Sequence, residues 1–152
     1  MRHLMVSLSF LFVAFQAQAA VGDTLHEFQA RCLETVSNGL SPVVSDLDIA
    51  PPPPNGPIDA WVIGDGAWEL WSVPDTPLNC SFVAANAAAG ADIDDVEGWV
   101  LQLIDSGAYE IVRQNSGGVT LRPLTTTAVG HEISYGIGEN LALRVRERAE
   151  VE

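Results

Sequence analysis

The sequence WVIGDGAWELWSV at positions 61–73, continued by PDTPLNCSFVA at positions 74–84, decides the fold. It contains three short runs of aromatic, β-branched and other apolar residues, separated by turns rich in Gly and Pro. This pattern predicts a three-stranded antiparallel meander. In the third run, alternation places Leu78, Cys80 and Phe82 on one face of the strand. We therefore expect Cys80 to lie in the core.

The segment before this meander predicts an amphipathic helix. Thr24 and Glu27 have the spacing of a capping box at its start, and Gly39 is a typical stop. The apolar stripe consists of Leu25, Phe28, Cys32, Leu33 and Val36. Because Cys32 lies in this stripe, it faces the layer that contains Cys80. The sequence therefore predicts a disulfide bond, Cys32–Cys80, between the helix and the sheet.

Residues 1–19 have the pattern of a cleaved signal peptide. Arg2 supplies the positive start, residues 4–15 form the apolar run, and Ala-Gln-Ala at 17–19 supplies the cleavage pattern. The alternative is a membrane anchor, but the apolar run is shorter than the roughly 20 residues that span a bilayer. We expect residues 20–152 to form a single exported domain, periplasmic or secreted, with no membrane span after cleavage. An oxidising compartment also suits two cysteines that lack a C-x-x-C redox motif.

The charge of the chain limits its partners. The formal net charge is -13, and every basic side chain other than histidine is an arginine. Such a protein repels phosphate backbones and offers no polybasic patch to anionic lipids. We expect no nucleic-acid partner, and a partner that is either an unidentified protein or a small ligand. The acidic residues are dispersed, which is typical of a surface that keeps an exported protein soluble.

The second half of the chain repeats the order of the first. A helix is predicted from its N-cap Asp92 to Gly107, and strands are predicted at 109–114, 119–122, 129–135 and 141–145. The expected fold is α+β: two amphipathic helices packed on one face of an antiparallel sheet, in the order α-βββ-α-βββ(β). The matched helix patterns suggest an internal duplication, although any two amphipathic helices share such a stripe.

The Pro-rich connection at 40–58 has two interpretations. It is either a structural strap that carries the chain from the first helix to the first strand, or a polyproline ligand for an aromatic groove on another protein. A proline tract alone is a weak signal, so the strap is favoured.

Few residues suit catalysis. His131 lies on the apolar side of a predicted strand, where a histidine is usually part of the core. An enzyme would be a small hydrolase or lyase that uses His131 with a carboxylate such as Glu110. The sequence has no G-x-S-x-G elbow, no His-Glu-x-x-His motif and no complete EF-hand pattern. We therefore predict no metal site and no cofactor.

Three of the four tryptophans, Trp61, Trp68 and Trp71, occur in the first meander. Trp68 and Trp71 are an odd number of positions apart, so they point to opposite faces of the sheet. An exposed Trp is a frequent anchor for a partner. The sequence thus favours a non-catalytic binding or inhibitor-like module over the hydrolase or lyase. A third class is an accessory subunit of an envelope complex, which would expose an apolar patch.

Overall fold

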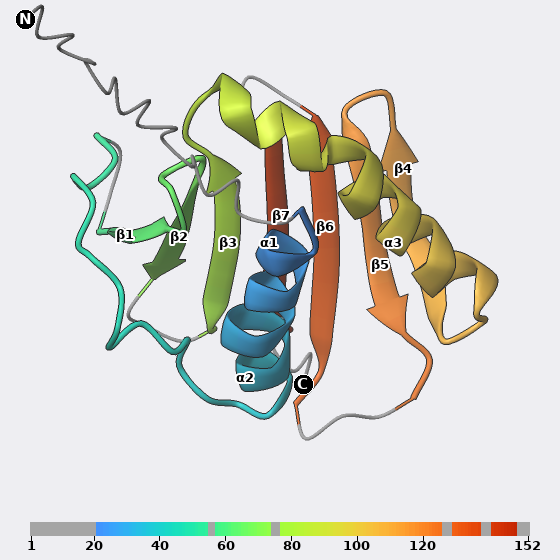
Figure 1. Ribbon diagram of the computed structural model, residues 1–152. Coiled ribbons are helices and arrows are strands. Elements are labelled where there is room, and N and C mark those ends of the chain that lie inside the picture. The colour runs from blue at the N-terminus through green and yellow to red at the C-terminus, as the bar shows by residue number, and fades with distance from the viewer. Residues whose placement is uncertain (1–20, 55–56, 74–76, 126–128, 138–140, 149–152) are drawn as a thin grey trace, which may run out of the picture.

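The computed structural model describes residues 21–54, 57–73, 77–125, 129–137 and 141–148 (Figure 1). The predicted signal peptide lies outside these residues. The helical segments are α1 (Val21–Phe28), the π-helical turn η1 (Gln29–Leu33), α2 (Glu34–Ser37), the 3-10 segment η2 (Ala87–Asp92) and α3 (Ile93–Asp105). The strands are β1 (Asp59–Ile63), β2 (Trp68–Val73), β3 (Asn79–Ala84), β4 (Tyr109–Asn115), β5 (Gly118–Pro123), β6 (His131–Ile137) and β7 (Leu141–Glu147).

All seven of these strands form one antiparallel sheet in the order β1-β2-β3-β7-β6-β5-β4. The two predicted meanders are joined where β3 pairs with β7, so that the last strand of each meander lies at the centre. At this junction Cys80 is opposite Val145 and Phe82 is opposite Leu143. All four side chains are buried. The predicted α+β class with an antiparallel sheet is confirmed.

Phe28 of α1 connects the layers of the core. Its ring packs edge-on against Phe82 of β3, with 5.5 Å between ring centroids, and against Trp99 of α3 at 6.1 Å. The Phe28 side chain is fully buried. Burial of a side chain of this size stabilises the fold by about 1.5–3 kcal/mol.

The predicted disulfide bond Cys32–Cys80 is present, with 5.4 Å between the two Cα atoms. Cys32 lies in η1 and Cys80 in β3, and neither is exposed to solvent. The bond therefore attaches the first helical segment to the centre of the sheet.

The helix α3 contacts the same side of the sheet as Phe28. The hydroxyl of Tyr135 on β6 donates a hydrogen bond to Glu97 of α3 at 3.1 Å. Tyr135 is opposite Leu143 on β7, and Leu143 is opposite Phe82, so these three side chains share one face. Figure 1 draws the helices in front of this face. Burial, together with the Glu97 carboxylate, raises the pKa of Tyr135 to about 12, so its hydroxyl keeps its proton.

The predicted start of the first helix is wrong. The residues from Val21 onward are already helical, so Thr24 lies within α1 and cannot cap it. The apolar spacing from Val21 to Leu25 continues the helical period one turn further upstream. Asp92 does occupy the N-cap position of α3, but its carboxylate forms no capping hydrogen bond. It accepts one from the indole Nε1 of Trp68 instead, at 2.6 Å.

The connection that begins at Leu40 is attached to both α1–α2 and β1. The Arg31 guanidinium donates to both carboxylate oxygens of Asp46, at 2.7 Å each, and holds the pKa of Asp46 at about 2. Further along, the amide of Val62 donates to the Asp48 carbonyl at 2.8 Å. This backbone pairing lies along the outer edge of β1. The described part of the connection is therefore attached at Asp46 to the first helical segment and at Asp48 to the edge strand β1.

Candidate functional site

The face of the sheet that points away from the helices, here called the helix-free face, carries a continuous row of polar and aromatic side chains. Following the strand register, its members are Trp71 on β2, Ser81 on β3, Arg144 on β7, Ser134 on β6 and Thr120 on β5. Each residue is the direct cross-strand partner of the next, so their side chains point to one side. The row thus spans five neighbouring strands.

Hydrogen bonds within the row fix its side chains. Arg144 donates from Nε to the hydroxyl of Ser81 at 2.9 Å. The hydroxyls of Thr120 and Ser134 are 3.1 Å apart and hydrogen-bonded. Trp71 donates from Nε1 to Glu69 at 2.7 Å. The row is therefore pre-organised, which lowers the entropic cost of binding a ligand.

A hollow of about 330 Å³ lies beside this row. Its floor follows the next register positions, where Gly118, Gly136 and Ala142 are opposite one another. These residues have no side chain or only a methyl group, so the backbone is left uncovered. Gly118 is required here because it has a φ of 154°, and an added Cβ would lie 2.2 Å from the carbonyl oxygen of Tyr135.

A β-bulge brings Arg113 to the rim of the hollow. The register moves from Ile111 opposite Leu121 to Arg113 opposite Thr120, so Val112 is the extra residue. If β4 paired regularly, with Val112 opposite Thr120, Arg113 would lie opposite Val119 and point to the helix side. With the bulge, Arg113 shares the face of Thr120 and lines the hollow together with Arg144.

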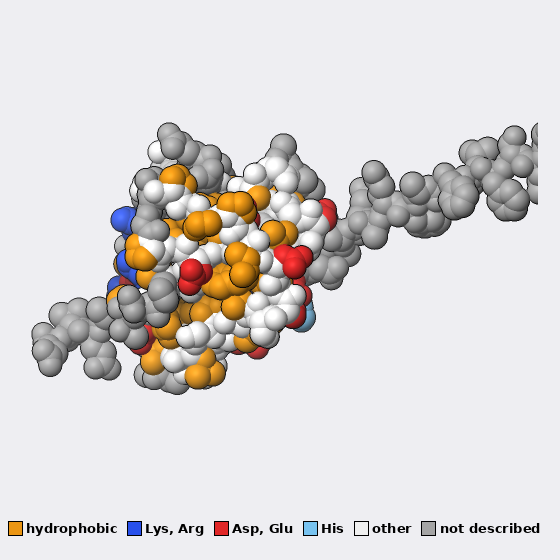
Figure 2. All heavy atoms as spheres, turned by 90° about the vertical axis from the view of Figure 1, so that its left-hand side faces the viewer, with side chains coloured by type: hydrophobic (Ala, Val, Ile, Leu, Met, Phe, Trp, Pro, Cys, Tyr) orange, Lys and Arg blue, Asp and Glu red, His pale blue; other side chains and the backbone are white. Residues whose placement is uncertain are grey.

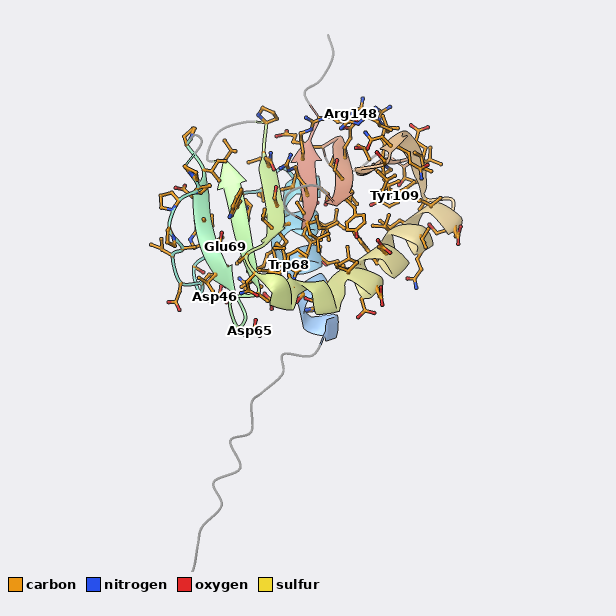
Figure 3. All side chains as sticks on the ribbon, turned by 90° about the horizontal axis from the view of Figure 1, so that it is seen from above. Asp46, Asp65, Trp68, Glu69, Tyr109 and Arg148 are labelled. Carbon is orange, nitrogen blue, oxygen red and sulfur yellow. A yellow bond between two sulfur atoms is a disulfide. The ribbon has the colours of Figure 1, made fainter. Side chains whose placement is uncertain are left out.

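The neighbouring row of the same face contains arginines that are paired with acids. Arg122 contacts Glu132 at 3.0 Å and Glu110 at 3.6 Å, and Arg146 contacts Glu132 at 3.1 Å. Burial opposes ionisation of Glu132, but the hydrogen bonds from the two arginines outweigh it and lower the pKa of this carboxyl. This row is a structural ion-pair network. Figure 2 shows some Arg side chains at one margin of the face in view, and Figure 3 shows nitrogen atoms gathered near Arg148, across the sheet from α3.

The three predicted binding tryptophans do not share a surface. Trp68 is buried between β2 and the start of α3, where Asp92 accepts its indole hydrogen bond (Figure 3). Trp61 is opposite Leu70, so it points to the helix side, and the strap residue Ile49 is paired with it. Among the three, Trp71 is on the helix-free face, and it is half-buried.

The predicted pair of His131 and Glu110 is not brought together. His131 lies on the helix side of β6 and is 1 % exposed, with its ring 6.4 Å from that of Tyr109. Glu110 is the cross-strand partner of Arg122 on the opposite face of the sheet. Burial lowers the pKa of His131, so it is neutral at pH 7.

A cavity of about 160 Å³ adjoins His131. Its lining includes the Thr125 hydroxyl and the side chains of Arg122 and Arg148, and no carboxylate among the residues that the structure describes. Likewise, within the described ranges no group of three or more His, Cys, Asp or Glu is placed to hold a metal ion. No described helix is long and apolar enough to cross a membrane.

Sequence reasoning missed the residues that form the row and the hollow, apart from Trp71. The glycines at 118 and 136 were a usable signal, because a glycine inside a strand often marks a place where the backbone is approached closely. The position of Arg113 was not readable, since the bulge that turns it has no sequence signature. In comparisons with known proteins, no family model, curated protein or solved structure matches this chain.

Proposed function

We propose that this protein is an exported, non-catalytic binding module that holds its ligand on the helix-free face. The observation that carries this proposal is the row in which Trp71, Ser81 and Arg144 are direct cross-strand neighbours. An indole and a guanidinium both offer flat surfaces and hydrogen-bond donors. For this reason Trp and Arg are enriched among the residues that dominate binding energy. The guanidinium of Arg144 is already held by Ser81.

Export is supported by the chemistry of the disulfide bond. A fully buried bond between Cys32 and Cys80 suits an oxidising compartment such as the periplasm or the extracellular space. The pattern at residues 1–19 supplies the signal for reaching it.

We also infer that the fold is a duplicated unit whose two helices form one layer on the sheet. The segment α1–α2 precedes the β1–β3 meander, and α3 precedes the β4–β7 meander. The two units join through their last strands, β3 and β7. This arrangement places the last strand of each unit at the centre of the sheet, as expected for two copies related by a rotation. It leaves one face of the sheet without helices.

A binding screen tests the proposed function. The oxidised, ¹⁵N-labelled protein is screened by NMR against short peptides, mono- and disaccharides and small organic acids. We expect hits to shift the amide signals of residues 69–71, 80–82 and 142–144. We expect Trp71→Ala to weaken binding at least tenfold, and Trp71→Phe, which keeps an aromatic ring, to weaken it less.

Three results would refute the proposal. The first is a set of hits that shifts only signals near His131, the second is equal binding by Trp71→Ala, and the third is the absence of any hit at millimolar concentration. The dispersion of the amide signals in each variant shows whether its fold is intact.

A second candidate function, an accessory subunit of an envelope complex, is favoured by the apolar surface of the strap. Leu40, Val43 and Ile49 are exposed, and Ile49 has 83 % of its surface accessible. Figure 2, which views the β1 side, shows hydrophobic side chains gathered on this face. Isolated apolar residues are normal on a surface, but a contiguous group marks an interaction site. Ile49→Ser should abolish co-purification with an envelope complex and leave binding to the helix-free face unchanged.

The third candidate, a hydrolase or lyase, draws no support from the described geometry. His131 and Glu110 are on opposite faces of the sheet, so the carboxylate cannot orient the imidazole.

A further inference from the structure

We propose that the hollow beside the polar row is a carboxylate-binding site, in which Arg113 and Arg144 hold the anionic head of the ligand. This inference rests on the proposed binding role of the helix-free face, and it names the class of ligand. It is carried by the shape of the hollow, by the charges on its rim and by the contrast with the ion-paired arginines Arg31, Arg122 and Arg146.

The floor of the hollow lets a ligand approach the sheet closely. Gly118, Gly136 and Ala142 follow one another across three strands. Side chains of ordinary size at these positions would fill the space. A volume of about 330 Å³ is at the lower end of the range for small-molecule sites, roughly 300–1,000 Å³. It therefore holds a carboxylate together with part of the molecule that carries it.

The charge on the rim is positive and unbalanced. Arg113 and Arg144 line the hollow, and no acidic side chain among the described residues does so. Neither arginine forms an ion pair within the described part of the chain. By contrast, Arg31, Arg122 and Arg146 each contact a carboxylate, and Arg148, which forms no ion pair among the described residues either, does not line the hollow. In a chain with a net charge of -13, acidic residues far outnumber arginines. Two arginines that line one hollow without an acidic neighbour therefore indicate a site for an external anion.

The guanidinium of Arg144 is held in place by one hydrogen bond. Its Nε donates to Ser81, and among the described residues its two terminal nitrogens have no hydrogen-bond partner. These nitrogens form the planar fork that matches the two oxygens of a carboxylate. The hydroxyls of Thr120 and Ser134 lie between the two arginines on the adjoining strands. One of them donates to the other, so the pair supplies one further donor.

The rest of the ligand extends toward Trp71. Trp71 is two strands from Arg144 through Ser81, and strands are about 4.8 Å apart, so the separation is about 10 Å. Glu69, beside Trp71, is an acid and accepts the indole hydrogen bond. The anionic head is therefore favoured at the arginine end and disfavoured at the tryptophan end. This polarity predicts an organic acid whose apolar or flat part contacts Trp71.

NMR titration with two matched pairs of probes tests the site. The first pair is benzoate and its neutral analogue benzamide. The second is an acetylated tripeptide with a free C-terminal carboxylate and the same peptide as an amide. We expect each acid to shift the amides of Gly118, Gly136 and Ala142 and to bind at least tenfold more tightly than its amide. The tighter of the two acids identifies the source of the carboxylate, a small free acid or a peptide terminus.

Variants on the same face separate a built site from general charge. Arg113→Gln and Arg144→Gln should each weaken the acids at least tenfold, and Arg144→Lys should weaken them because it keeps the charge but loses the fork. The matched control is Arg146→Gln, which removes the same charge from the ion-paired row and should change affinity less than twofold.

Three results would overturn the proposal: the acid and its amide bind equally well, Arg146→Gln loses as much affinity for the acids as Arg113→Gln and Arg144→Gln do, or inorganic phosphate shows saturable binding and the acids do not. Trp71→Ala distinguishes its failure from that of the proposed function. If benzoate still binds to Trp71→Ala with wild-type affinity, the carboxylate site stands and the role of Trp71 falls. If Trp71→Ala loses every hit of the screen while Arg144→Gln keeps them, the binding role of Trp71 stands and the carboxylate site is refuted.

Discussion

Removal of the Cys32–Cys80 bond is the most direct test of how the two layers are held together. The two residues are 48 positions apart, and the chain-entropy relation for a loop of this length gives roughly 4 kcal/mol of stabilisation. Single domains are stable by about 5–15 kcal/mol, so this one bond supplies a large share. We expect the reduced protein to remain folded at 25 °C, because Phe28 and Val36 keep the helical segment in the core, but to lose about 4 kcal/mol.

Urea unfolding, followed by tryptophan fluorescence, measures this loss in the wild-type protein and in the double variant Cys32→Ala/Cys80→Ala. Reduction of the wild type removes the crosslink but keeps both sulfurs, so it isolates the crosslink from packing. The stability of the double variant should not change with reductant. Any stability that it loses beyond that of the reduced wild type reports the two small cavities left by the missing sulfurs. A change below about 1 kcal/mol on reducing the wild type, or two free thiols in the non-reduced protein, would refute the reasoning.

Three further predictions concern packing, backbone conformation and pH. Asp92→Ala leaves the buried indole N–H of Trp68 without its acceptor and should lower the free energy of unfolding by about 1–3 kcal/mol, measured by urea unfolding. Gly98→Ala has open space in α3 and should stabilise by about 0.5–1 kcal/mol, whereas Gly118→Ala meets the Tyr135 carbonyl and should destabilise; thermal melts with opposite shifts check this pair. Burial lowers the pKa of His131 in the folded protein below 6.5, so protons bind preferentially to the unfolded chain; stability should fall as pH drops below about 6.5, and a pH series of melts on His131→Gln should lack this component.

The local structure was predictable because neighbouring residues determine it. The helical stripe placed Cys32 in the core, and the alternation of the third strand placed Cys80 there, so the disulfide bond followed from two local patterns. The strand pattern around His131 likewise predicted its burial. The start of the first helix was missed because a good capping box is only a local preference, and the helical period continued beyond Thr24. The role of Asp92 was missed because its partner Trp68 is 24 residues away.

The candidate site depends on pairings that no local pattern encodes. Alternation within β7 predicts that Arg144 points away from the core, but not that β7 lies between β3 and β6. Only that placement puts Arg144 between Ser81 and Ser134. The same holds for Glu110, whose position opposite Arg122 separates it from His131.

The bulge at Val112 determines which face of the sheet Arg113 occupies. A single extra residue in β4 shifts the alternation, so that Arg113 joins the face of Thr120. Regular pairing of the same residues would put Val112 opposite Thr120 and Arg113 on the helix side, and would leave Arg144 alone at the hollow. Deletion of Val112 removes the extra residue but keeps Arg113 opposite Thr120, so it should leave binding of a carboxylate within about twofold of wild type, in contrast to Arg113→Gln. The register of one edge strand, and not the composition of the chain, would then determine where the positive charge of this acidic protein is available to a ligand.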